Sequence, residues 1–226
     1  MKKQVSNFLH LLLFAIVAVE LYGRITGNIR IEYPVKPLIM IWMAAFFLLH
    51  RRKKQLTRPV LIAFFFSWLG DIFLMFSHRT ELFFFAGVGG FFLAQVSYIY
   101  LFARYSEHGG RGYLQDNLII GFLFLGYLAG IFYLLNPGLE GAMKPVLLLY
   151  ALTLIGMSMM ALNRKGRVNR KSFLLVFIGS VLFVISDSLI ALDKFYRDIP
   201  LAGFWIMITY ISAQYLIMRG LLLERK

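Results

Sequence analysis

The stretch FLLVFIGSVLFVISDSLIAL, residues 173–192, decides the fold class of this chain. It contains one charged side chain, Asp187, and a mainly apolar run of about 20 residues is long enough to cross a bilayer as a helix. The sequence therefore predicts an all-α polytopic membrane protein, a single integral membrane domain over residues 1–226. The eight predicted transmembrane helices cover residues 8–23, 34–49, 60–76, 82–103, 117–135, 145–162, 173–192 and 199–219.

The composition agrees with this fold class. The chain is 60% hydrophobic and only 15% charged, whereas soluble domains are about a quarter charged. Although the formal net charge is +13, the basic residues lie in short loops such as HRRKK (50–54) and NRKGRVNRK (163–171), which is typical of topology signals facing anionic headgroups. We therefore expect no nucleic-acid partner. Cysteine is absent, which excludes disulfides and thiolate sites.

The charge of the loops predicts the orientation. With eight spans the termini share one side, and that side carries 17 of the 24 Lys and Arg residues against 7 on the other. The positive-inside rule then places both termini in the cytoplasm. The first 20 residues have the basic and apolar parts of a signal peptide without a clean cleavage site, so we expect an uncleaved first helix. We expect a multi-pass protein of the bacterial inner (cell) membrane.

The two halves of the chain, 1–110 and 111–226, carry similar motifs in the same order. A Lys-Pro pair opens a span in each half and a basic loop follows; a span with an aspartate and a span with Ala-Gln come next. Two four-helix halves would be related by an axis along the membrane normal, so the sequence favours two parallel four-helix repeats. The matching segments are VKPLI (35–39) with MKPVL (143–147), SWLGDIFL (67–74) with FVISDSLI (183–190), and LAQVSY (93–98) with SAQYLI (212–217).

The two intramembrane aspartates, Asp71 and Asp187, are the candidate catalytic residues. An ionised Asp at the centre of a span costs about 2.5–3.5 kcal/mol on insertion scales, so an aspartate at this depth indicates a compensating partner or a function. Two carboxylates in one cavity of low dielectric do not both ionise readily; one keeps its proton and the other stays charged. An acid and a base from one residue type suit acid-catalysed hydrolysis. The alternative is that each Asp pairs with a lysine for structural reasons, Lys36 and Lys144 being the candidates.

Other polar residues on the same spans are candidates for substrate binding. Gln95 and Gln214 either position a substrate or water or hydrogen-bond neighbouring helices. Glu20 is also intramembrane, and Arg24 one turn later predicts an i,i+4 ion pair. The full set of predicted substrate-binding residues is Lys36, Lys144, Ser67, Gln95, Tyr98, Ser186 and Gln214.

Several functional classes lack their signatures. The four histidines lie at span ends or in loops without ligand-type partners at i,i+4, so we expect no zinc site or other metal site. The sequence also contains no G-x-S-x-G elbow, P-loop or dinucleotide fingerprint.

Taken together, the motifs resemble those of the YhhN-type membrane family, the lysoplasmalogenases. The resemblance is carried by KPL (36–38), SWLGDIFL (67–74), FFLAQVSYI (91–99), FVISDSLIAL (183–192) and YISAQYLI (210–217), and it runs from about 33 to 219. It implies an eight-span helical fold that hydrolyses the vinyl ether bond of lysoplasmalogens without a cofactor. It also places the family's two aspartates at Asp71 and Asp187 and its lysine at Lys36. Many members have a His where this chain has Gln95.

The resemblance implies a lysophospholipid substrate drawn from membrane lipid, with a fatty aldehyde and glycerophosphoethanolamine or glycerophosphocholine as products. Vinyl ether hydrolysis starts with proton transfer to the alkene carbon, for which a protonated Asp is suited, and a carboxylate can stabilise the cation and activate water. Lys36 and Lys144 are the predicted partners of the substrate phosphate. A proton-coupled transporter or lipid flippase with the same two aspartates is the main alternative, and a purely structural membrane protein is a third.

Overall fold

The computed structural model describes residues 2–51, 54–104 and 112–224, and within these ranges it contains helices and no strands. Eight of the helices are long and apolar enough to cross a membrane, which confirms the predicted all-α polytopic fold. The helices are α1 (Lys2–Thr26), α2 (Ile29–His50), α3 (Thr57–Met75), α4 (Glu81–Arg104), α5 (Tyr113–Asp116), α6 (Leu118–Leu135), α7 (Met143–Leu162), α8 (Arg170–Phe195) and α9 (Ala202–Leu222), with 3-10 turns at Lys54–Leu56 and Asn136–Gly138.

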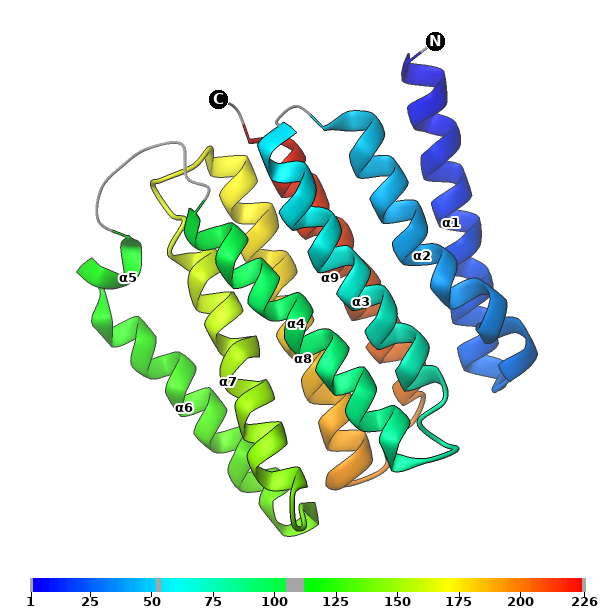
Figure 1. Ribbon diagram of the computed structural model, residues 1–226, viewed down its shortest axis with the longest axis vertical. Helices are drawn as coiled ribbons and strands as arrows, with labels where there is room; N and C mark the ends of the chain where they lie inside the picture. Colours follow the sequence, from blue (N-terminus) through cyan, green and yellow to red (C-terminus); the bar gives the residue numbers. More distant parts are fainter. Residues whose placement is uncertain (1, 52–53, 105–111, 225–226) are drawn as a thin grey trace.

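The eight long helices run up and down one bundle, and α1 begins at the same end of the bundle at which α9 ends (Figure 1). We call this the basic end, because the basic connection 163–169 joins α7 to α8 there. Helices α1 and α6 lie at opposite edges of the view in Figure 1, and α3, α4, α8 and α9 lie between them. The two aspartate-bearing helices, α3 and α8, are thus placed inside the bundle.

The long helices differ from their predicted boundaries by up to six residues, and for the starts of α2 and α9 the structure shows a local reason. Helix α2 begins at Ile29 rather than at residue 34, because the Asn28 side chain accepts a hydrogen bond from the Arg30 amide and caps a polar first turn that hydropathy does not detect. Helix α9 begins at Ala202 rather than at residue 199. Its preceding residue, Leu201, has a left-handed backbone with φ of 57°, which separates the connection from the helix.

The closest helix pairs are α3 with α4 and α8 with α9, and small residues allow the approach. A Cβ on Gly90 of α4 would lie 2.8 Å from the Gly70 nitrogen of α3, and a Cβ on Gly179 of α8 would lie 2.8 Å from the Ala213 oxygen of α9. Gly70 directly precedes Asp71, so this close contact fixes the depth and direction at which the carboxylate leaves its helix.

Candidate active site

Asp71 is held in the bundle by side chains from two other helices. Its Oδ1 lies 3.4 Å from the Lys36 ammonium of α2, and its Oδ2 accepts a 2.7 Å hydrogen bond from the Tyr210 hydroxyl of α9. Asp71 is 2% exposed and Lys36 is 7% exposed. A buried carboxylate needs this combination of a cation and a hydrogen-bond donor to offset its lost hydration.

A hydrogen-bond network extends from Asp71 through α9 to α4. Gln214 donates to Ser67 at 3.0 Å and to the Tyr210 hydroxyl at 3.5 Å, and its carbonyl accepts a 2.6 Å bond from Tyr98. These side chains are all buried. Four predicted residues, Ser67, Tyr98, Gln214 and Lys36, therefore gather around Asp71 as one polar cluster.

Asp187 forms a second cluster with α4 and α7. Its Oδ2 accepts hydrogen bonds from the Tyr150 hydroxyl at 2.5 Å and from the Gln95 amide at 3.3 Å. The Gln95 carbonyl in turn accepts a 2.7 Å bond from Thr153. The Gln95 amide orientation is thereby fixed, with its nitrogen toward Asp187. Each aspartate thus has one partner on the preceding long helix of its own half of the chain and one partner in the opposite half.

The two clusters differ in charge. Asp71 has a lysine partner, whereas the partners of Asp187 among the described residues are neutral. Phe91 packs edge-on against Tyr210, the hydrogen-bond donor to Asp71, at 5.7 Å, and against Phe183, one turn before Asp187, at 6.1 Å.

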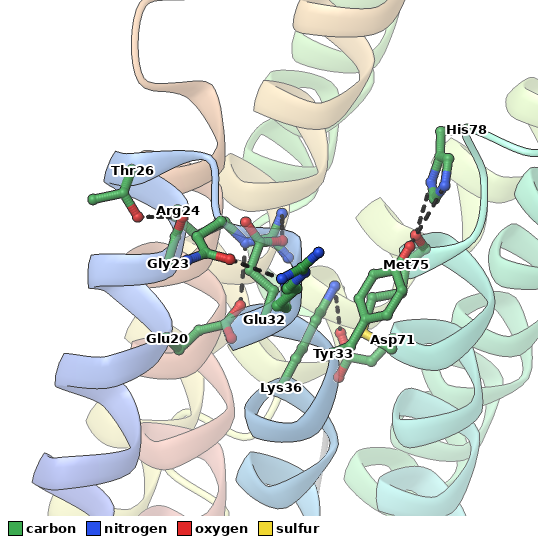
Figure 2. Close-up of polar contacts among 12 residues, drawn as sticks. Glu20, Gly23, Arg24, Thr26, Glu32, Tyr33, Lys36, Asp71, Met75 and His78 are labelled. Carbon is green, nitrogen blue, oxygen red and sulfur yellow. Dashed lines mark hydrogen bonds and ion pairs between the residues drawn. The ribbon is translucent and has the colours of Figure 1, made fainter.

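A cavity of about 530 Å³ with several charged side chains in its lining, here called the vestibule, lies at the end of the bundle opposite the basic end. Lys36 lines it, and so do Arg24, Glu32, His78 and Lys194. Figure 2 shows Lys36 directed toward Asp71 and Arg24 lying between Glu20 and Glu32.

The predicted pair between Glu20 and Arg24 is confirmed, with 3.1 Å between Arg24 Nε and Glu20 Oε1. The guanidinium also contacts Glu32 of α2 at 3.0 Å, a partner that the sequence did not indicate. Tyr33 and His78 form a longer contact of 3.5 Å on the other side of the cavity (Figure 2). The vestibule therefore carries charges of both signs, as a zwitterionic ligand requires.

Asp187 faces a different cavity of about 70 Å³, the Asp187 pocket, which is mainly apolar and is lined by Leu74 of α3 and by side chains of α4, α6, α7 and α8. Leu74, Phe84 and Ile190 line both this pocket and the vestibule, so the two cavities meet at these side chains. The arrangement places a vestibule lined by charged side chains beside an apolar pocket that contains Asp187. Asp71 lines neither of these two cavities and is joined to the vestibule through its ion pair with Lys36.

Two predicted residues lie outside these clusters. Ser186 donates to the Ile206 carbonyl of α9 at 3.1 Å and so joins two helices. Lys144 is exposed at the start of α7 and is not among the residues that line the vestibule or the Asp187 pocket. Its matching position in the other half, Lys36, enters the bundle because α2 packs between α1 and α3.

Three residues of the two clusters were absent from the predicted substrate-binding set: Tyr150 and Tyr210, which donate to the aspartates, and Thr153, which donates to Gln95. A signal exists for two of them, since Tyr210 lies one turn before Gln214 and Thr153 lies one turn after Tyr150, which puts each pair on one helix face. Among the described residues no group of three or more His, Cys, Asp or Glu side chains could hold a metal ion.

Comparison with known proteins identifies the family of this chain. The YhhN family model matches residues 31–221. The lysoplasmalogenase TMEM86A of Bos taurus is 33% identical over 190 residues, and that of Homo sapiens is 30% identical over 190 residues. Each alignment covers 80% of this chain and 73% of the relative. No solved structure gives a significant match. The matched range contains both aspartate clusters and all helices from α2 to α9, and the chain belongs to the YhhN family.

Proposed function

We propose that the protein is a membrane-embedded hydrolase that cleaves the vinyl ether bond of lysoplasmalogens. The products are a fatty aldehyde and a glycerophospho-headgroup. The observation that carries the proposal is the meeting of a charged vestibule with an apolar pocket, with Asp187 in the pocket and Asp71 paired to Lys36 of the vestibule. A lysoplasmalogen has the same division, because its vinyl ether joins a zwitterionic headgroup to an alkyl chain. The relatives named as lysoplasmalogenases support the same substrate class.

The different surroundings of the two aspartates suggest their roles. Asp187 lies in an apolar pocket among neutral donors, which suits a carboxylic acid that keeps its proton. Asp71 lies beside the Lys36 ammonium, which suits a permanent carboxylate. We assign Asp187 as the general acid and Asp71 as the carboxylate that stabilises positive charge and orients water.

The reaction then balances with these groups and one water molecule. Asp187 transfers its proton to the alkene carbon that does not bear oxygen, and an oxocarbenium ion forms. The Phe91 ring, which lines the Asp187 pocket, is proposed to stabilise the developing cation, together with the negative charge of Asp71, whose hydrogen-bond donor Tyr210 packs on Phe91. Water adds to the oxocarbenium carbon and loses a proton to a carboxylate. The resulting hemiacetal collapses as its hydroxyl proton leaves and the glycerol oxygen takes a proton, which returns both acids to their first state.

The vestibule is the proposed headgroup site. Lys36 and Arg24 supply positive charge for the phosphate, and Lys194 at the rim adds a third cation. Glu32 is the proposed partner of an ammonium or trimethylammonium group. Lys144, the second lysine predicted for the phosphate, is exposed away from these residues, so the proposal omits it.

The test is aldehyde release by the purified protein from alkenyl lysophosphatidylethanolamine. We expect the wild type to release aldehyde and the Asp71→Asn and Asp187→Asn variants to lose at least a hundredfold in rate, as removal of a positioned acid or base does. Asp116→Asn is the matched control, because Asp116 is exposed in α5 at the basic end. Full activity in both buried variants would refute the two-acid mechanism. Proton-dependent lipid transfer without aldehyde would favour the transporter or flippase.

A further inference from the structure

A second apolar cavity of about 930 Å³ lies between α6, α7 and α8 on the basic-end side of Asp187. We call it the tail groove. Its walls carry Ile120, Leu123 and Phe124 from α6 and Phe177, Val181 and Val184 from α8. Lys165 and Arg170 line its far end. The mechanism proposed above does not use this cavity.

The tail groove continues the Asp187 pocket. Tyr127 of α6 and Ile155 of α7 line both cavities, and the Tyr127 hydroxyl lies 2.8 Å from the Ser188 hydroxyl, one residue after Asp187. On α8, Val181 and Val184 of the groove and Ser188 of the pocket follow one another at intervals of three and four residues. This spacing puts them on one helix face, so a single track runs along α8 through both cavities.

The length of the track suits a lipid chain. Arg170 lies 17 positions before Asp187, and at 1.5 Å per residue this is about 25 Å along α8. One leaflet of a bilayer gives its chains about 15 Å, half of the ~30 Å hydrocarbon core. The groove is therefore long enough for the whole chain of a membrane lipid that starts at Asp187.

The groove is also accessible from the bilayer. Helix α6 lies at the edge of the bundle (Figure 1), and Leu123 in its wall is 70% exposed. In a membrane such an exposed apolar groove faces lipid chains rather than water. A lipid can thus place its chain between α6 and α8 from the side, without threading it from the vestibule.

We propose, on the basis of the function proposed above, that the tail groove binds the alkenyl chain of the substrate and sets the chain length that the enzyme accepts. The order of the three compartments matches the order of the substrate's parts: the headgroup lies in the vestibule, the vinyl ether at Asp187 and the alkyl chain in the groove. Val181 is the specificity-determining residue, because it lies six positions before Asp187, about 9 Å along the track.

The first test replaces Val181 by tryptophan and compares lysoplasmalogens with hexadecenyl and octenyl chains. The longer chain must pass position 181 and the shorter one ends near it. We expect the ratio of kcat/KM for hexadecenyl over octenyl substrate to fall at least tenfold in Val181→Trp. Ile178→Trp is the control, because Ile178 is on the same helix, is 47% exposed and is not among the groove residues. Equal ratios in the two variants would overturn the proposal.

The second test reads binding without hydrolysis. The probe is a saturated 1-O-hexadecyl lysophosphatidylethanolamine with a diazirine near the chain end. Irradiation should label groove residues such as Phe177 and Ile120, and excess unmodified 1-O-hexadecyl lipid should remove the label. Labelling spread over Ile178 and Phe122, which face outward, would contradict a specific groove.

The two tests separate the proposals. Groove labelling in a protein that releases no aldehyde would support the chain site and refute the hydrolase. Aldehyde release without competed groove labelling would leave the hydrolase standing and overturn the chain site.

Discussion

Tyr150 donates a 2.5 Å hydrogen bond to Asp187, and its replacement by phenylalanine tests the role assigned to that aspartate. If Asp187 is the proton donor, its carboxyl group is neutral before the reaction and gains negative charge as the proton leaves. The Tyr150 hydroxyl then donates to a neutral group in the bound substrate complex and to a charged group in the transition state. Tyr150→Phe should therefore lower kcat more than it weakens substrate binding.

The magnitude follows from the difference between the two hydrogen bonds. A bond to a charged group contributes about 1.5–3 kcal/mol and a neutral one about 0.5–1.5 kcal/mol, so the transition state loses about 1–1.5 kcal/mol more than the ground state. Because 1.36 kcal/mol is tenfold in rate, kcat should fall about fivefold to about twelvefold.

The assay is steady-state aldehyde release at saturating and limiting lysoplasmalogen, which separates kcat from KM. Tyr133→Phe is the matched control, because Tyr133 is 80% exposed on α6. A Tyr150→Phe variant whose kcat equals that of the control, with only KM raised, would refute the assignment of Asp187 as the acid.

Three further predictions concern stability and cofactor use. Lys36→Met should lower the free energy of unfolding by about 3–5 kcal/mol in SDS titrations of mixed micelles, because it leaves buried Asp71 without its cation. Adding Asp71→Asn to this variant should recover part of the loss. Additive effects of the two substitutions would contradict the ion pair. Gly90→Ala should lower the free energy of unfolding by about 1–3 kcal/mol, because its Cβ would lie 2.8 Å from the Gly70 backbone. Gly89→Ala, whose Cβ would have nothing within 4 Å, should be neutral or slightly stabilising in the same titration. Equal effects of the two substitutions would show that α3 and α4 can separate freely. The proposed mechanism uses only side-chain groups and water, so dialysis against EDTA should leave aldehyde release unchanged, and loss that Zn²⁺ or Mg²⁺ restores would contradict it.

The fold was largely predictable because a bilayer demands long apolar helices, and each run reads directly from the sequence. The boundaries were less so. The start of α2 depends on the Asn28 cap and on a charged first turn in which Glu32 pairs with Arg24 of α1. The start of α9 depends on the backbone of Leu201. Hydropathy contains neither kind of information. The short helix α5 was not predicted for the same reason.

The site was predictable in its charged residues and less so in its tyrosines. An intramembrane aspartate, lysine or glutamine is rare enough to stand out, and Asp71, Lys36, Gln95 and Gln214 all occur in the two clusters. The chain contains 12 tyrosines, and tyrosine is common at membrane interfaces, so the sequence alone could not distinguish Tyr150 as a site residue.

Lys144 shows the limit of reasoning from a repeat. Its motif matches that of Lys36, but the two lysines have different neighbours, because α2 lies beside α1 and α3 whereas Lys144 starts a helix near the bundle edge and is exposed. The parallel repeat of residues 1–110 and 111–226 and the cytoplasmic placement of the termini stay predictions. Cysteine accessibility labelling from each side of the membrane would test the orientation, with Lys165 and Lys144 as sites expected on opposite sides.

Proton transfer from Asp187 to the alkene carbon is the first step of the proposed reaction, and the mass of the aldehyde formed in D₂O measures it directly. We expect one deuterium at the carbon next to the aldehyde carbonyl when the wild type acts and the product is reduced at once. Asp187→Asn should give no such product above the enzyme-free background. Aldehyde from the wild type without that deuterium, or labelled aldehyde formed equally well by Asp187→Asn, would refute Asp187 as the proton donor.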